Sequence, residues 1–293
     1  MTQSDTGTVA ELIRLSFGKL TRSEKQIANT LLGDYPVAGL QSITEFARAA
    51  DVSSPTVIRT VQKLGFSGFP DFQNQLREEL SAQLSTPLTR HAQWAVGAPE
   101  GHLLNTYAAA VADNLENSLK LVDHHEFDGI VDLLADTTRA IHLVGGRVTR
   151  VLADYLSTYL LAVRPGVSSL PQSNSQWPQH LIGMEPGDVL LVFDIRRYER
   201  NLNELATLAH KRGATIVVLT DQWISPIGSI AEHTIPVRVE APSSSDSAVV
   251  MFFMVEVLLA SVVQKLWPGA KQRIEDLEDL FDATGRFGKQ RNR

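Results

Sequence analysis

A segment in the first third of the chain carries hydroxyl and basic side chains at spacings that suit the binding of a polyanion. Residues 53–64 contain neither Asp nor Glu. In a helix, four apolar side chains would pack inward together: Val57, Ile58, Val61 and Leu64. The polar side chains of the other face, with the serines before them, are candidates for contacts with DNA: Ser53, Ser54, Thr56, Arg59, Thr60 and Lys63. Arg59 is expected to reach a base edge or a phosphate, and Lys63 a phosphate.

A second group of candidate binding residues lies in loops that follow apolar segments of the C-terminal half. The loop at 145–149 reads GGRVT, which offers close approach to the backbone, a cation and a hydroxyl. It lacks the GxGxxG spacing of dinucleotide sites, so no nicotinamide cofactor is expected, and no other cofactor is predicted. With polar residues of three further loops it forms the candidate effector site: Gly145, Gly146, Arg147, Thr149, Ser173, Asp194, Arg196, Arg197 and Ser245.

Two adjacent arginines of this set, Arg196 and Arg197, have two interpretations. With Arg147 they can grip a carboxylate or a phosphate, because the guanidinium fork matches a planar anion. Alternatively, the two arginines pair with Asp194 and Glu199 and lock the loop without a ligand. The sequence leaves both interpretations open.

The composition excludes several kinds of chemistry. The chain has no cysteine, which removes disulfides, thiolate nucleophiles and cysteine zinc sites and is typical of a reducing cytoplasm. His124 and His125 have no third ligand at a suitable spacing, so no metal site is expected. No loop shows a clear pair of residues for acid-base catalysis, so no catalytic residue is assigned. We therefore expect a binding protein and not an enzyme.

Charge and hydropathy must be read locally in this chain. The 293 residues carry a net charge of −6, whereas the first 90 are neutral, with nine basic and nine acidic residues. The most apolar run, 248–263, contains Glu256 and is shorter than the roughly 20 residues of a membrane span. The start of the chain is too polar for a signal peptide. We expect a cytoplasmic protein with a buried helix at 248–263 and no membrane partner.

Helix boundaries around the candidate DNA-contacting residues predict a helix-turn-helix. Capping-box pairs mark two helix starts before it: Thr21 with Glu24, and Ser42 with Glu45. Residues 51–54 then form a turn, Ser54 is the expected N-cap of the next helix, Pro55 its first residue, and Gly65 follows its end. Since any small helical bundle can present a solvated basic face, the motif alone does not establish DNA binding.

The residues that follow make the motif specific. Residues 52–72 read VSxxTVxRxxxKLGFxGFxxF, which resembles the helix-turn-helix domain of the RpiR family of bacterial regulators. The resemblance covers roughly residues 9–84. Pro55 stands before Thr56 where the family often has a small residue, and Thr60-Val61 stands where an aromatic residue is common after the arginine. The change at Thr60 is expected to alter the base preference. The resemblance implies a double-stranded DNA operator as partner.

The C-terminal half alternates between apolar strands and helices. Five strands are predicted: 140–144, 166–170, 189–193, 215–219 and 233–237. Helices are predicted near 149–163, 176–183, 200–212 and 247–266. This pattern is typical of a parallel sheet, whose ligands bind at the carboxyl ends of the strands. With the glycine-rich first loop, the EPGD at 185–188 and the RGA at 212–214, it resembles the SIS (sugar isomerase) domain that RpiR regulators carry.

The loop after the third strand departs from that family. SIS domains that bind sugar phosphates usually have SxSGxT there, whereas this chain has DIRRYE at 194–199. The resemblance therefore implies a small anionic effector, which is a sugar phosphate, a sugar acid or another carboxylate. It also implies a homodimer or homotetramer that matches palindromic DNA. The alternative is a SIS-type sugar-phosphate isomerase with an accessory helical domain, which the altered loop disfavours.

The predicted architecture is thus an all-α helix-turn-helix domain followed by an α/β three-layer SIS domain with a parallel five-stranded sheet. The expected boundaries are a DNA-binding domain at 1–84, a linker at 85–102, an effector-sensing domain at 103–268, and a C-terminal helix with a basic tail at 269–293.

Overall fold

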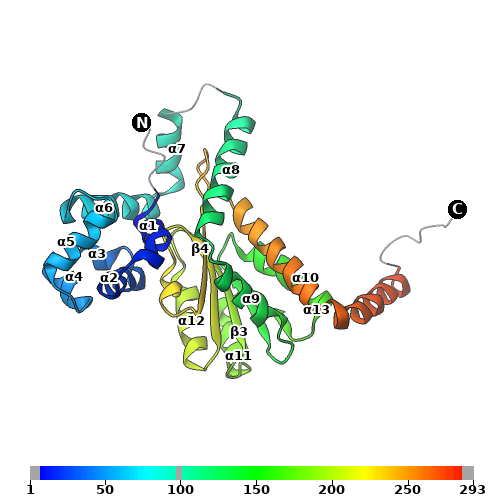
Figure 1. Cartoon of the computed structure of the whole chain (residues 1–293). Coiled ribbons are helices and arrows are strands. Elements are labelled where there is room, and N and C mark those ends of the chain that lie inside the picture. The colour runs from blue at the N-terminus through cyan, green and yellow to red at the C-terminus, as the bar shows by residue number, and fades with distance from the viewer. Residues whose placement is uncertain (1–6, 97–100, 286–293) are drawn as a thin grey trace.

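The N-terminal part of the protein is a bundle of short helices (Figure 1). The structure, a computed structural model, describes residues 7–96 and 101–285. The bundle consists of α1 (Val9–Ser16), η1 (Phe17–Lys19), α2 (Arg22–Gly33), α3 (Val37–Leu40), α4 (Ile43–Ala49), α5 (Ser54–Lys63) and α6 (Phe69–Leu84). The capping boxes predicted for α2 and α4 are present, and a further one begins α1: Thr8 with Glu11.

Three aromatic rings hold the helices of this bundle together. Phe46 of α4 is fully buried and packs on Phe69 and Phe72 of α6, with ring centroids 6.3 and 6.4 Å away. Val57 and Val61 of α5 belong to the same cluster. The helix that follows the turn is therefore fixed on a core of its own domain.

The stretch predicted as a linker contains a helix. Helix α7 (Pro87–Val96) lies within residues 85–102, and Thr86 Oγ1 accepts a hydrogen bond from the Thr89 amide at 3.2 Å. Pro87 marks the first turn of this helix, where its missing N–H costs no hydrogen bond. At the other end of the chain, the predicted basic tail falls on residues 286–293, outside the described residues.

The C-terminal part is an α/β domain, as predicted. Its elements are α8 (Leu103–Leu121), α9 (His124–Ala135), β1 (Ile141–Gly145), α10 (Arg150–Val163), β2 (Val167–Ser169), η2 (Asn174–Gln176), α11 (Trp177–Ile182), β3 (Val189–Asp194), α12 (Arg200–Lys211), β4 (Thr215–Asp221), η3 (Pro226–Ser229), β5 (His233–Val237) and α13 (Val249–Ala283). The five strands are parallel and lie in the order β2-β1-β3-β4-β5. All five lie where the apolar runs predicted them.

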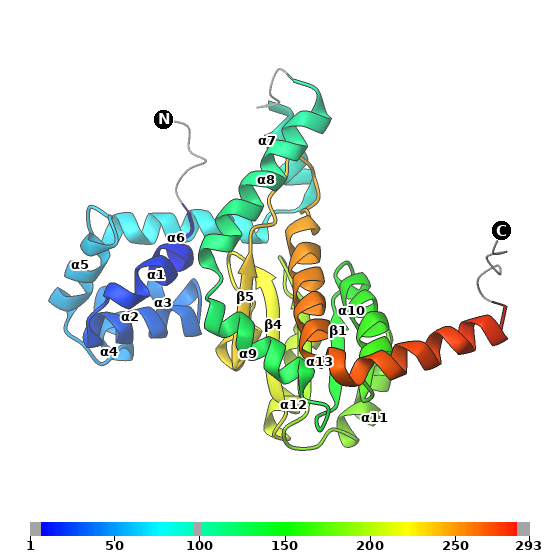
Figure 2. The same cartoon turned by 45° about the vertical axis from the view of Figure 1, so that its right-hand side comes forward.

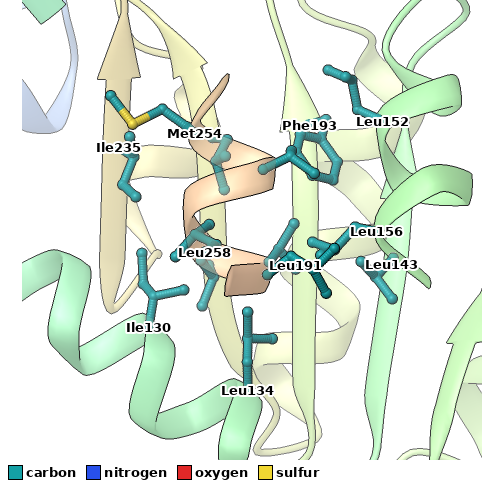
Figure 3. Close-up of a cluster of buried hydrophobic side chains, with 14 of the residues drawn as sticks. Ile130, Leu134, Leu143, Leu152, Leu156, Leu191, Phe193, Ile235, Met254 and Leu258 are labelled. Atoms are coloured by element: carbon teal, nitrogen blue, oxygen red, sulfur yellow. The ribbon is translucent and has the colours of Figure 1, made fainter. Parts of the chain in front are cut away.

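Helices cover both faces of the sheet and make three layers. Alternate residues of β3 point to opposite faces: Leu191 packs with α9, α10 and α13, and Leu190 packs with α11 and α12. Figure 3 shows the first of these clusters, in which Leu134 and Leu258 approach the sheet beside Leu191. Because all the strands are parallel, their carboxyl ends meet at one edge, where the candidate effector loops lie.

Helix α13 is one continuous helix and not two. It runs through Pro268, so the C-terminal helix predicted at 269–293 is the outer part of the helix predicted near 247–266. Its first half is buried against the sheet, including Met251, Met254 and Leu258. The helix is long and apolar enough to meet the length and composition criteria of a membrane span, which core helices of globular domains also meet. Its second half projects away from the domain, on the side opposite the helical bundle (Figure 2).

Candidate DNA-reading helix and effector loops

The turn before α5 positions the candidate DNA-contacting residues. Asp51 adopts a left-handed conformation with φ of 52°, and the Val52 amide donates to the Ala47 carbonyl oxygen at 2.9 Å. The N-cap is Ser53 and not Ser54, since Ser53 Oγ accepts from the Thr56 amide at 3.4 Å. Ser54 is therefore the first helical residue. Gly65 follows the helix with φ of 104°, as its glycine identity predicts.

The inward face of α5 is rotated relative to the prediction. Val57 and Val61 are buried as expected, but Thr60 is only 2% exposed and Ile58 is 38% exposed. The prediction that Thr60 points outward and Ile58 inward was wrong. The Thr60 hydroxyl donates to the Thr56 carbonyl oxygen at 2.8 Å, so its burial leaves no unpaired polar group.

Two basic side chains of α5 have different environments. Lys63 Nζ lies 2.7 Å from Glu24 Oε2 and donates to the Lys19 carbonyl oxygen at 3.0 Å, so Lys63 joins the end of α5 to the start of α2. Arg59 is exposed. The surface of α5 that faces solvent is formed by five exposed residues: Pro55, Ile58, Arg59, Gln62 and Lys63.

In the effector loops, the hydroxyl of Thr149 ties two strands together. Thr149 Oγ1 accepts from the Gly146 amide at 2.9 Å and donates to the Phe193 carbonyl oxygen at 2.7 Å, which joins the ends of β1 and β3. A Cβ on Gly145 would lie 2.6 Å from the Arg150 amide nitrogen, so only glycine fits there. Gly145, Gly146 and Thr149 therefore build the backbone of this loop.

A carboxylate of the protein itself lies in this loop. Glu199 Oε1 accepts a hydrogen bond from the Arg147 amide at 2.6 Å, and a Cβ on Gly146 would approach the same oxygen to 2.8 Å. Glu199 thus sits one residue before α12 and reaches across to the loop that precedes α10. It occupies the place beside a helix N-terminus that favours an anion.

Two buried aspartates lie at the carboxyl ends of β3 and β4. Asp194 accepts from Ser225 Oγ at 2.5 Å and from the Glu199 amide at 3.4 Å, and burial raises its pKa to about 7. Asp221 accepts from Tyr198 Oη at 2.6 Å, and burial raises its pKa to about 6. Sequence reasoning missed Asp221, although an aspartate that ends an apolar strand at this edge was a usable signal.

Arg196 points away from the β1 loop, toward the helical bundle. Its guanidinium lies 3.0 Å (Nε to Oδ2) from Asp246 and 4.1 Å from the ring centroid of Trp223. It also donates to the Ala82 carbonyl oxygen and to Ser85 Oγ at the end of α6. The interpretation that Arg196 pairs with Asp194 and Glu199 was wrong about the partners. Arg196 is nevertheless held in place, by Asp246, Trp223 and the end of α6.

Asp246 extends this contact to the helix of the linker. Its Oδ1 lies 2.6 Å from Nη1 of Arg90 on α7, and its Oδ2 faces Arg196. The loop after β3 is thereby connected to α6 and to α7. Nothing in the sequence signalled Asp246, because its partner Arg90 lies 156 positions away along the chain and Arg196 lies in a different loop.

The other predicted effector residues are dispersed. Arg197 is exposed, with φ of 65°, and Arg147 is exposed on the neighbouring loop. Ser173 is exposed in the loop after β2, with its hydroxyl 2.7 Å from that of Ser175. Ser245 is exposed in the loop before α13, next to Asp246 in the sequence. Across residues 7–96 and 101–285, no group of three His, Cys, Asp or Glu residues has the geometry of a metal site.

Two family profiles match the two parts of the chain. Residues 7–83 match "Helix-turn-helix domain, rpiR family", and residues 133–261 match the SIS domain. Among curated proteins, the transcriptional regulator HexR of Pseudomonas aeruginosa is 28% identical over 262 residues, with 86% of this chain and 88% of HexR covered. HexR of Escherichia coli is 26% identical, with 96% of each chain covered.

Solved structures show the same fold. The Vibrio vulnificus NanR protein, complexed with ManNAc-6P, has a TM-score of 0.54 and 21% identity, and the match covers 94% of this chain and 98% of NanR. The sugar isomerase domain of an RpiR transcription factor from Sphaerobacter thermophilus has a TM-score of 0.57 and 21% identity, with 61% of this chain and 99% of that domain covered. The chain belongs to the RpiR family of helix-turn-helix, DNA-binding transcriptional regulators that carry a SIS domain.

Proposed function

We propose that this regulator binds a double-stranded operator through α5 and senses a small anionic metabolite through its SIS domain. The observation that carries the proposal is the exposed Arg59 on a helix anchored by Val57 and Val61 after a tight turn. In a helix-turn-helix, this second helix enters the major groove. The protein acts in the cytoplasm, where its operator lies, and as a homodimer or homotetramer that places two such helices on a palindrome.

The proposed set of DNA-contacting residues is the set predicted from the sequence without Thr60. Ser53, Ser54 and Thr56 stand at the N-terminus of α5, where hydroxyls and free amides meet phosphates. Arg59 reaches base edges or phosphate, and Lys63 meets a phosphate beside Glu24. Thr60 supports the helix from within, since its side chain is buried.

A gel-shift experiment tests the DNA-binding half. The full-length protein selects duplexes from a random pool, and its affinity for the selected operator is measured at several salt concentrations. Arg59→Ala is expected to weaken binding by about 1–3 kcal/mol, roughly fivefold to 150-fold. Arg200→Ala removes the same charge from α12, where the side chain is exposed, and is expected to leave affinity unchanged. Failure to enrich any sequence would contradict the proposal.

For the effector, the loop at 145–149 is the proposed site. The exposed Arg147 and Arg197 supply positive charge, and the amides before α10 suit an anion. The complex of the similar NanR protein with a sugar phosphate supports this ligand class, which here includes sugar acids and other carboxylates. The Glu199 carboxylate accepts a hydrogen bond from the Arg147 amide, so an anion that binds this amide displaces Glu199.

The signal passes to the bundle through Arg196 in this proposal. Arg196 and Glu199 belong to the same short loop, and Arg196 holds the end of α6 while Asp246 holds α7. Displacement of Glu199 therefore moves the segment that fixes the DNA-binding domain. The ligand shifts the population between two placements of that domain.

A thermal-shift screen tests the sensing half. Phosphorylated sugars, sugar acids and dicarboxylates are screened with the full-length protein, and at least one is expected to raise its Tm. Arg147→Ala is expected to weaken the response, whereas Arg200→Ala, on the nearby helix α12, retains it. If both variants respond like the wild type, the anion binds elsewhere.

A further inference from the structure

The solvent face of α5 exposes one large apolar side chain. Ile58 is 38% exposed and lies outside the hydrophobic cluster of the bundle. Its neighbours on the same face are Pro55 and Gln62, which lie one turn before and after it, and Arg59 beside it.

The hydrophobic core of the bundle is complete without Ile58. Val57 and Val61 already anchor α5 in the core, where they are 0% and 1% exposed. A β-branched residue also has a lower helix propensity than Ala, Leu, Arg or Gln, and an exposed apolar side chain gains nothing from water. Ile58 therefore suits a surface that becomes buried against something apolar.

The major groove offers one apolar group that distinguishes a base. Thymine alone carries a 5-methyl group there, and apolar side chains recognise it by contact. Ile58 is the fifth residue of α5, within the half of a recognition helix that contacts base edges. Its neighbour Arg59 supplies the charge that holds the helix against the duplex.

We propose that Ile58 reads the methyl group of one thymine in each half of the operator. The proposal rests on the proposed function, in which α5 enters the major groove. It assigns this residue the discrimination of thymine, whereas Arg59 contacts a base edge or a phosphate and Lys63 contributes affinity through charge.

Replacement of single thymines by deoxyuridine tests this assignment. The base change removes the methyl group and keeps base pairing, so only a methyl contact is lost. In the selected operator, one thymine per half-site is expected to lower the affinity of the wild-type protein about threefold to fivefold, the effect of one buried methyl group. Ile58→Ala is expected to bind the thymine and deoxyuridine operators equally. Gln62→Ala, one turn away on the same exposed face, is the control that keeps the difference.

The outcomes separate this proposal from the proposed function. If the wild-type protein binds the operator but no deoxyuridine weakens it, Ile58 does not read thymine and DNA binding stands. If Ile58→Ala keeps the full methyl effect, another residue makes the contact and the assignment is overturned. If no sequence is selected at all, both proposals fail. Circular dichroism checks that each variant is folded.

Discussion

The guanidinium carbon of Arg196 lies 4.1 Å from the centroid of the Trp223 ring, in the contact between the two domains. Trp223 is buried and follows β4, whereas Arg196 follows β3. The planar cation thus rests on the ring while its nitrogens reach Asp246 and the end of α6. A loop that usually holds phosphate in related SIS domains here holds the DNA-binding domain.

Loss of this arginine is expected to loosen the bundle from the SIS domain. Arg196→Ala removes one of the two cations that neutralise Asp246. It is expected to lower the free energy of unfolding by about 3 kcal/mol, because a buried ion pair loses one partner. Urea unfolding and the rate of trypsin cleavage between the domains measure the effect. Arg200→Ala removes an exposed pair with Glu204 and is expected to cost less than about 1 kcal/mol. Equal costs for the two variants would exclude a special role for Arg196.

Neutralisation of Glu199 is expected to strengthen anion binding. Glu199→Gln keeps the size of the side chain but removes a negative charge beside the Arg147 amide, so inorganic phosphate is expected to bind roughly tenfold more tightly. Isothermal titration measures the affinity. Glu204→Gln, on the exposed side of α12, serves as the control and is expected to leave it unchanged. An unaltered affinity in Glu199→Gln would show that phosphate does not use this loop.

Burial of Asp194 predicts a pH dependence of stability. Its folded-state pKa of about 7 exceeds that of an unfolded aspartate, so the folded protein keeps a proton that the unfolded chain releases. The free energy of unfolding is therefore expected to fall as pH rises from about 4 to about 7. Asp194→Asn should flatten this dependence, as followed by urea unfolding at several pH values.

Asp136 provides a control of opposite sign for this measurement. Hydrogen bonds from the Thr138 hydroxyl and amide lower the pKa of Asp136 to about 2. Its contribution is present above pH 4 and is lost as pH falls, so Asp136→Asn removes stability at neutral pH. A slope that Asp194→Asn leaves unchanged would locate the titrating group elsewhere.

The buried Thr60 is expected to matter for folding and not for DNA contact. Thr60→Val keeps the shape of the side chain and removes a hydroxyl that bonds only to the Thr56 carbonyl oxygen, so the cost is expected to be below about 1.5 kcal/mol. Gel shifts with the selected operator are expected to match those of the wild type. A loss of affinity as large as that of Arg59→Ala would show that Thr60 contacts DNA.

Local patterns predicted the elements well because local physics decides them. The capping boxes at Thr21 and Ser42 and the apolar runs of the five strands are present in the structure. The rotation of α5 was not predictable in the same way. Residues 57, 58 and 61 and residues 57, 60 and 61 both form a stripe at helical spacing, and only packing against α2, α4 and α6 selects the second.

Long-range contacts account for the errors in the candidate site. Arg196 and Ala82 lie 114 positions apart, and no single-sequence pattern brings them together. The resemblance to SIS domains predicted a site at one edge of the sheet, and Glu199 and Arg147 meet at that edge. It gave no sign that the adjacent Arg196 turns to the other domain.

In the proposed function, the position of Glu199 affects how the protein responds to the concentration of its effector. A carboxylate tethered to the chain is present at the same effective concentration at every dilution of the protein. A diffusing anion that binds the Arg147 amide therefore competes with the Glu199 carboxylate, whose effective concentration is constant. In the proposed function, residue 199 therefore sets the effector concentration at which the protein responds. A conservative substitution of Glu199 would change that concentration and leave the residues that contact the ligand unaltered.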